Sequence, residues 1–79
     1  MFEELQFQVM RLLSERLSAT QADLVRALGR PDTEVKQALL DLEKQQLIHS
    51  AYDSITGSSL ISPTSMGLLR FRQNASMTG

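Results

Sequence analysis

The feature of this sequence that most constrains its fold is a pair of short amphipathic segments joined by a tight turn. The spacing of apolar residues predicts one helix from about Thr20 to Leu28 and another from about Thr33 to Gln46. Gly29 favours the left-handed conformation that ends a helix, and Pro31 has the φ of a first helical residue. Two short helices with so brief a link are expected to cross and to bury their inner faces against each other. The inward residues are expected to be Ala22, Leu24, Val25 and Leu28, then Val35, Ala38, Leu39 and Leu42.

A longer amphipathic stretch precedes this pair. Between Phe2 and Leu17, apolar residues recur at three- and four-residue intervals, which predicts a first helix with these residues on its inner face. Phe7 falls almost opposite Val9 on that helix, so the pattern gives it no partner within the chain. It is expected to be either an isolated exposed aromatic or a contact with another molecule. Thr20 then caps the second helix, and Asp23 places a negative charge near its N-terminal dipole.

The helical period is lost after residue 46, where a different pattern begins. Residues 47–52 and 58–62 have the pattern of two strands, and the turn-rich segment 53–57 between them predicts a β-hairpin. Tyr52 is expected to cover the apolar side of this hairpin, with stacking on a base or a partner aromatic as the alternative. Pro63 ends the second strand, and Thr64 caps a last helix. The apolar residues of that helix are Met66, Leu68, Leu69 and Phe71.

Length and composition exclude several classes of function. With 79 residues the chain has room for one core, so residues 1–73 are expected to form one domain and residues 74–79 a frayed tail. Cysteine is absent and His49 is the only histidine, which excludes disulfides and the usual metal sites. Neither a glycine-rich phosphate loop nor a nucleophile motif occurs, so we expect no enzymatic activity and no cofactor. Without a signal peptide or membrane span, a cytoplasmic location is expected.

The order of three helices, a hairpin and a further helix is that of a winged helix-turn-helix, an α+β fold. The runs 24–29 and 34–43, followed by Leu47-Ile48, resemble the core of MarR- and ArsR-type winged-helix transcriptional regulators. The segment Thr64-Ser65-Met66-Gly67 resembles the Thr-x-x-Gly that opens their last helix, and the likeness spans about residues 18 to 71. It departs from the family at Gln46, where a glycine usually ends the third helix. This helix is therefore expected to run on slightly or to end by another route.

The resemblance implies that the third helix enters the major groove of double-stranded DNA while the second helix braces against the backbone. Thr33, Lys36 and Gln37 would then face base edges, because Gln can pair with adenine and Lys can donate to guanine. Polar side chains and free backbone N–H groups near the helix starts would meet phosphate oxygens. The residues implied for these contacts are Thr20, Gln21 and Arg30, and Lys44 completes the implied DNA-binding set.

The charge distribution argues against DNA binding. The formal net charge is −1, and the third helix carries three carboxylates against two lysines. Residues 47–62 contain no Lys or Arg, although wings that reach DNA normally contact it through basic residues. Two hypotheses therefore stay open: a homodimeric DNA-binding regulator, and a winged-helix adaptor that binds another protein with little or no DNA binding. A continuous positive strip across the second and third helices would favour the first.

Both hypotheses require a surface that contacts another chain. The adaptor is expected to use its uncharged wing or the apolar outer face of the first helix. In the homodimer, the first helix, with the last helix as a further contributor, is expected to join the two chains through large apolar side chains. The residues expected at this contact are Phe2, Phe7, Met10 and Phe71.

Overall fold

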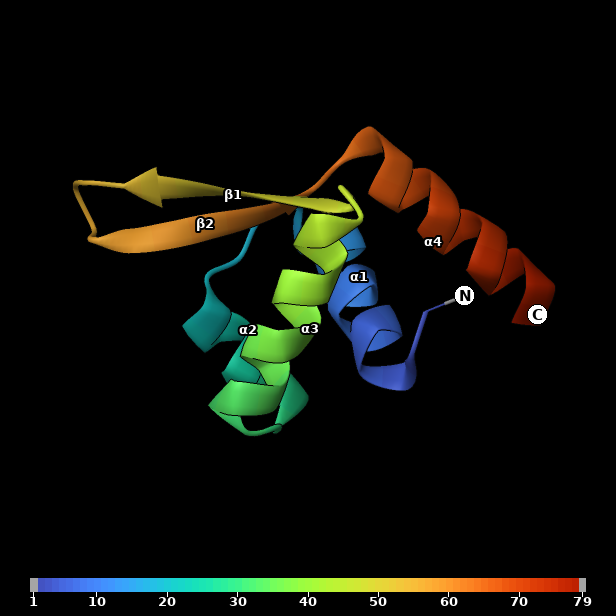
Figure 1. Ribbon diagram of the computed structural model, residues 1–79, viewed down its shortest axis with the longest axis horizontal. Helices are drawn as coiled ribbons and strands as arrows, with labels where there is room; N and C mark the ends of the chain where they lie inside the picture. Colours follow the sequence, from blue (N-terminus) through green and yellow to red (C-terminus); the bar gives the residue numbers. More distant parts are fainter. Residues whose placement is uncertain (1, 79) are drawn as a thin grey trace.

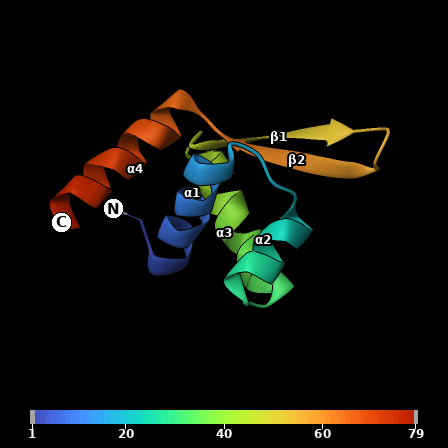
Figure 2. The same ribbon diagram turned by 180° about the vertical axis from the view of Figure 1, so that it is seen from behind.

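The computed structural model describes residues 2–78 and confirms the expected α+β winged helix-turn-helix. Helices α1, α2 and α3 form a body from which the β1–β2 hairpin and α4 extend on opposite sides (Figure 1, Figure 2). None of the helices in this part of the chain has the length and apolar character needed to cross a membrane. The elements are α1 (Glu4–Arg16), α2 (Gln21–Leu28), α3 (Asp32–Lys44), β1 (Ile48–Asp53), β2 (Ser58–Pro63) and α4 (Ser65–Thr78).

The core lies where the inner faces of the three body helices meet the base of the hairpin. All four residues expected on the inner face of α3 are buried, with Val35 and Leu42 fully so. Each large apolar side chain that is removed from water stabilises the fold by about 1.5–3 kcal/mol. This apolar cluster therefore fixes which face of α3 points outward. Its largest fully buried members are Met10, Leu13, Leu24, Leu42 and Leu47.

The start and end of α2 confirm the sequence predictions. The Thr20 hydroxyl accepts a hydrogen bond from the backbone N–H of Asp23 at 3.1 Å, and Gly29 ends the helix with a φ of 63°. Two expectations about this region are wrong. Ala22 is exposed, because it lies on the side of α2 that faces a groove below the hairpin. Pro31 is the N-cap of α3 instead of its first residue, because its ψ of 144° is extended.

The connection between α1 and α2 is attached to the hairpin. Leu17 has a left-handed φ of 70° and is 64% exposed, although the helical pattern predicted an inward position. The backbone leaves the helical path at this residue, so the periodicity of α1 no longer determines where its side chain points. Ala19 then pairs with β2: its N–H donates to the Ile61 oxygen at 2.9 Å, and the Ile61 N–H donates back at 2.8 Å. This pairing holds the start of α2 beside the hairpin.

The end of α3 departs from the expected path at Gln46, which adopts a left-handed φ of 61° without being glycine. The Gln46 N–H donates to the Glu43 oxygen at 2.9 Å, and the Leu47 N–H donates to the Leu42 oxygen at 3.0 Å. This is the Schellman arrangement that glycine usually makes. The helix therefore ends at Lys44, and the expectation that it would avoid the left-handed conformation is wrong. Burial of Leu47 and a hydrogen bond to the Gln46 carbonyl offset the backbone strain.

Thr64 and Gly67 join α4 to this helix end. The Thr64 hydroxyl donates to the Gln46 oxygen at 2.7 Å and accepts from the Gly67 N–H at 3.0 Å. A Cβ atom on Gly67 would collide with the carbonyl oxygen of Leu47, so the close approach requires glycine. We call Gln46, Leu47, Thr64 and Gly67 the α3–α4 junction.

Beyond the junction, α4 continues to Thr78. Residues 74–78 are helical, whereas the sequence predicted a frayed tail from 74 to 79. Neither glycine nor proline interrupts this segment before Gly79, and the Asn74 amide donates to the Arg70 oxygen at 2.8 Å. Gly79 itself lies outside the described residues.

The hairpin is packed at its base and free at its tip. Ile48 pairs with Pro63 and Ser50 with Ile61, and both isoleucines are buried. Tyr52 is 71% exposed, so the expectation that it covers the apolar side is wrong. Tyr52 is the last residue but one of β1, and its cross-strand partner is Ser59, so the opposite strand gives it no apolar partner.

Candidate nucleic-acid interface

One face of α3 presents a stripe of exposed side chains opposite its buried stripe. Four of its members, Thr33, Lys36, Gln37 and Lys44, were predicted to contact DNA. Leu40, which is 44% exposed, was not predicted, although it lies one turn after Lys36 and the same helical spacing would have found it. We call this stripe the outer face of α3: Thr33, Lys36, Gln37, Leu40 and Lys44.

Three of the predicted residues form side-chain contacts, two of them near the helix starts and one within α3. The Gln21 amide donates to the Asp32 carboxylate at 2.8 Å and so links the first residues of α2 and α3. Arg30 pairs with Glu34 at 3.3 Å, and the Gln37 amide donates to Asp41 at 3.1 Å. All three contacts are exposed to solvent, so each contributes little to stability and can exchange for a ligand contact.

A groove of about 370 Å³ runs between α3, the start of α2 and the hairpin. The structure brings Thr20, Gln21 and Lys36 together along this groove. Its other polar side chains include Glu43 and Ser50, whose hydroxyl donates to the Glu43 carboxylate at 2.7 Å. No pattern in the sequence predicted this groove, because it depends on how the hairpin sits over α3.

Arg30 and Gln37 lie on the opposite side of α3. They line a second hollow together with the acidic side chains Glu3, Glu4, Glu34 and Asp41. Five of the seven predicted DNA contacts are therefore divided between a groove beside the hairpin and an acidic hollow beside the start of α1, and Thr33 and Lys44 line neither.

The positive charges of the helix-turn-helix are few and separated. Arg26 and Arg30 are neutralised by ion pairs with Asp23 and Glu34, at 2.7 Å and 3.3 Å. Among the described residues, neither Lys36 nor Lys44 has an ion-pair partner within 4.0 Å, and two helical turns separate them. The cations do not form the continuous strip that would favour the DNA-binding hypothesis outright.

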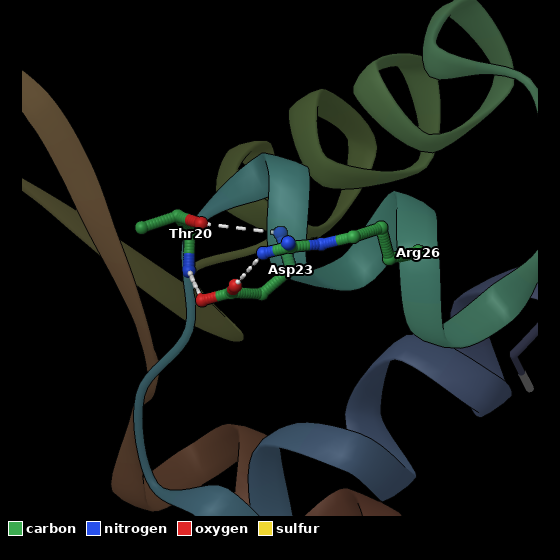
Figure 3. Close-up of polar contacts among 3 residues, drawn as sticks. All are labelled: Thr20, Asp23 and Arg26. Carbon is green, nitrogen blue, oxygen red and sulfur yellow. Dashed lines mark hydrogen bonds and ion pairs between the residues drawn. The ribbon is translucent and has the colours of Figure 1, made fainter.

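Thr20, Asp23 and Arg26 form one polar cluster at the start of α2 (Figure 3). The Asp23 carboxylate accepts from the Thr20 N–H at 3.2 Å and from Arg26 at 2.7 Å. The pKa of Asp23 is lowered, chiefly by the Thr20 backbone hydrogen bond and then by the Thr20 hydroxyl and Arg26. Ionised Asp23 therefore caps α2 and also forms an ion pair with the guanidinium of Arg26.

The residues expected at a partner contact are packed largely within the chain. The rings of Phe7 and Phe71 lie 5.0 Å apart at a tilt of 37°, so the prediction that Phe7 lacks an intramolecular partner is wrong. α4 returns to the first helix, which the periodicity of α1 alone does not reveal. Met10 is fully buried, and Phe2 packs partly buried against the core. The structure therefore brings Phe7 and Phe71 into contact, and it places Met10 in the core and Phe2 against the core.

The part of the chain described by the structure also has no group of three or more His, Cys, Asp or Glu side chains placed to hold a metal ion. His49 is exposed on β1.

Comparison with known proteins identifies the fold. No family model and no curated protein sequence matches the chain. ZitR from Lactococcus lactis is 25% identical, with a TM-score of 0.85 over 95% of this chain and 51% of its own. The adhesin competence repressor AdcR from Streptococcus pyogenes is 20% identical, with a TM-score of 0.86 over 98% of this chain and 56% of its own.

A third structure, MepR from Staphylococcus aureus in complex with DNA, is 25% identical, with a TM-score of 0.87 over 98% of this chain and 64% of its own. MepR is a transcription regulator of a multidrug efflux pump. The chain thus spans between about half and two thirds of the length of these proteins. Its element order, and its likeness to these structures over nearly all its length, show that the chain is a winged helix-turn-helix domain with the fold of MarR-type transcriptional regulators.

Proposed function

We propose that this chain is the DNA-binding domain of a transcriptional regulator, with α3 in the major groove. The observation that carries the proposal is the outer face of α3, where Thr33, Lys36 and Gln37 stay exposed while the opposite stripe is buried. An α-helix fits the major groove of B-DNA, which is about 12 Å wide. The likeness to MepR, which has been solved with DNA, supports the same conclusion.

The contacts divide into two kinds. Lys36 and Gln37 donate to base edges, and Thr33 lies beside them on the first turn of α3. Thr20 and Gln21 face the phosphate backbone at the start of α2, where backbone N–H groups are also available. Arg30 is a further phosphate contact once it leaves Glu34, an exchange that costs no more than about 1 kcal/mol for an exposed ion pair. Lys44 lies two turns beyond Lys36 and meets the backbone rather than a base.

We further propose that the chain acts as a homodimer joined around α1 and α4. Support comes from α4, where Met66 is 48% exposed and Leu69 is 56% exposed one turn apart. Half-buried Phe2 packs against the core just before α1. A two-fold pair would present two α3 helices to half-sites about one turn of DNA apart. Light scattering coupled to size exclusion measures the mass in solution, and a monomer at high micromolar concentration would contradict this.

The test of DNA binding is a titration of labelled duplex DNA of random sequence across a salt series. Because the hairpin has no Lys or Arg, we expect a shallow dependence of affinity on salt. Each phosphate contact that is lost reduces the slope of log K against log salt by about 0.9. The variant Lys36→Ala is expected to weaken binding and to reduce the slope by about 1 if this lysine also neutralises a phosphate.

Arg72→Ala is the matched control for this variant, because Arg72 is an exposed cation on α4, remote from the outer face of α3. Its binding should equal that of the unchanged protein. Absence of duplex binding at the lowest salt concentration would contradict the proposed function.

The hairpin favours a second candidate function, that of an adaptor which binds another protein. Tyr52, Ile55 and Leu60 are 71%, 93% and 40% exposed, and no cation accompanies them between residues 47 and 62. Such a surface is better suited to an apolar protein contact than to phosphate. Under this alternative the salt series would show weak, salt-insensitive or absent DNA binding. The proteins of similar structure are regulators, and we propose no catalytic activity for either role.

A further inference from the structure

Leu40 is an apolar side chain at the centre of the outer face of α3. Successive residues of a helix are about 100° apart, so Thr33, Leu40 and Lys44 project in nearly the same direction. This direction points away from the core. Its side chain is 44% exposed, whereas the neighbouring Leu39 is 7% exposed. The inner face of α3 is complete without Leu40, so the core does not explain why a leucine lies here.

Leu40 has a lysine on either side of it along α3. Lys36 lies one turn before it and Lys44 one turn after it, and neither is ion-paired among the described residues. Leu40 also lines the groove between α3 and the hairpin, together with exposed Ala22 and half-buried Gln21. An apolar side chain thus stands between two cations, on the surface that the proposed function places against base edges.

The major groove offers few apolar features to such a side chain. Base edges there present hydrogen-bond donors and acceptors, and the C5-methyl group of thymine is the apolar exception. A leucine opposite a donor or acceptor leaves that group without a partner, which costs free energy. A leucine against a methyl group removes apolar surface from water on both sides.

We propose that Leu40 selects for a thymine methyl group at one position of each bound half-site. This inference rests on the proposed function. It adds an apolar residue that determines sequence specificity to the polar residues of α3. Leu40 lies about 6 Å along the helix axis from Lys36, and base pairs are stacked about 3.4 Å apart. With α3 along the groove, the thymine lies about two base pairs from the base that Lys36 contacts.

The experiment begins by selecting bound duplexes from a pool with a randomised central region. In one selected duplex, each thymine is replaced singly by deoxyuridine, which removes only the methyl group. We expect one position in each half-site at which this replacement weakens binding of the unchanged protein about fourfold, the value of one buried methyl-sized group. The variant Leu40→Ala is expected to bind the thymine and uracil forms of that position equally.

Two further variants separate specificity from folding. Leu40→Met keeps a long apolar side chain and should retain the preference for thymine. Leu17→Ala removes another exposed leucine, in the link between α1 and α2, and should retain the full fourfold difference. Circular dichroism of each variant establishes that it is folded, and the comparison of thymine with uracil on the unchanged protein needs no variant.

The outcomes distinguish this inference from the proposed function. Binding to selected duplexes without any position sensitive to the methyl group would overturn the inference alone. The same holds if Leu40→Ala keeps the fourfold difference. If the selection yields no bound duplex at all, the inference and the proposed function are both overturned.

Discussion

The two ends of α3 are held by contacts of very different kinds. At its C-terminal end, the α3–α4 junction joins backbone to backbone: the Thr64 N–H donates to the Leu47 oxygen at 3.0 Å, and Gly67 lies against the same carbonyl group. At its N-terminal end, solvent-exposed side chains form the contacts, as in the pair between Gln21 and Asp32. The junction cannot rearrange without moving the backbone, whereas the N-terminal contacts can exchange for water or a ligand at little cost. A helix fixed in this way keeps its direction while its outer face stays free to bind.

The largest expected effect comes from breaking the fixed end. Gly67→Ala places a Cβ against the Leu47 carbonyl oxygen, so α4 or the end of α3 must shift. We expect the free energy of unfolding to fall by about 2–3 kcal/mol, as in overpacked sites. Urea unfolding followed by circular dichroism measures this change.

Gly57→Ala is the control for this variant. Gly57 also has a positive φ, of 72°, but an added Cβ would meet nothing within 4 Å. Only backbone strain of about 1 kcal/mol is expected there. Equal losses in the two variants would show that the close approach at Gly67 does not hold the junction.

A smaller effect of opposite sign is expected at Gln46. Its left-handed conformation suits glycine, so Gln46→Gly should raise the free energy of unfolding by about 1 kcal/mol. The adjacent variant Gln45→Gly should lower it, because Gln45 has an ordinary φ of −86° and gains nothing from glycine's freedom. If Gln46→Gly destabilised the protein in the same thermal or urea assay, the left-handed end of α3 would be contradicted.

The smallest effect concerns the exposed polar cluster at the start of α2. The folded-state pKa of Asp23 lies below its ordinary value of 3.8, so ionised Asp23 stabilises the folded chain at neutral pH. This contribution is present above pH 3.8 and is lost as the pH falls through the lower folded-state pKa. The difference in thermal midpoint between the unchanged protein and Asp23→Asn should therefore shrink in acid. A difference in thermal midpoint that stays constant from neutral pH to about pH 3 would contradict the cap. This range reaches below the ordinary Asp pKa of 3.8, so the contribution of ionised Asp23 should already decrease within it.

The sequence predicted the features that depend on neighbouring residues. The Thr20 cap, the Gly29 end of α2 and the buried stripe of α3 follow from local propensity and helical spacing, and the same spacing named most of the outer face. Two of the failures involve partners remote in the chain. The stacking of Phe7 on Phe71 requires the return of α4, and the left-handed Gln46 is stabilised from the α4 side.

The candidate site was predictable in its residues but not in its shape. Periodicity placed Lys36 and Gln37 outward, yet it did not show that one lines the groove beside the hairpin and the other an acidic hollow. Leu40 escaped prediction because polar side chains alone were expected to contact DNA. The assignment of individual DNA contacts stays a prediction for the binding experiments.

The pairing of Ala19 with Ile61 has a mechanical consequence. Two backbone hydrogen bonds, of 2.9 Å and 2.8 Å, connect the segment before α2 to the inner part of β2. A displacement of the hairpin is therefore transmitted to Thr20 and Gln21 instead of being absorbed at the base of the strands. Any molecule that bends the hairpin tip, whether nucleic acid or protein, would also alter the spacing between α2 and the outer face of α3.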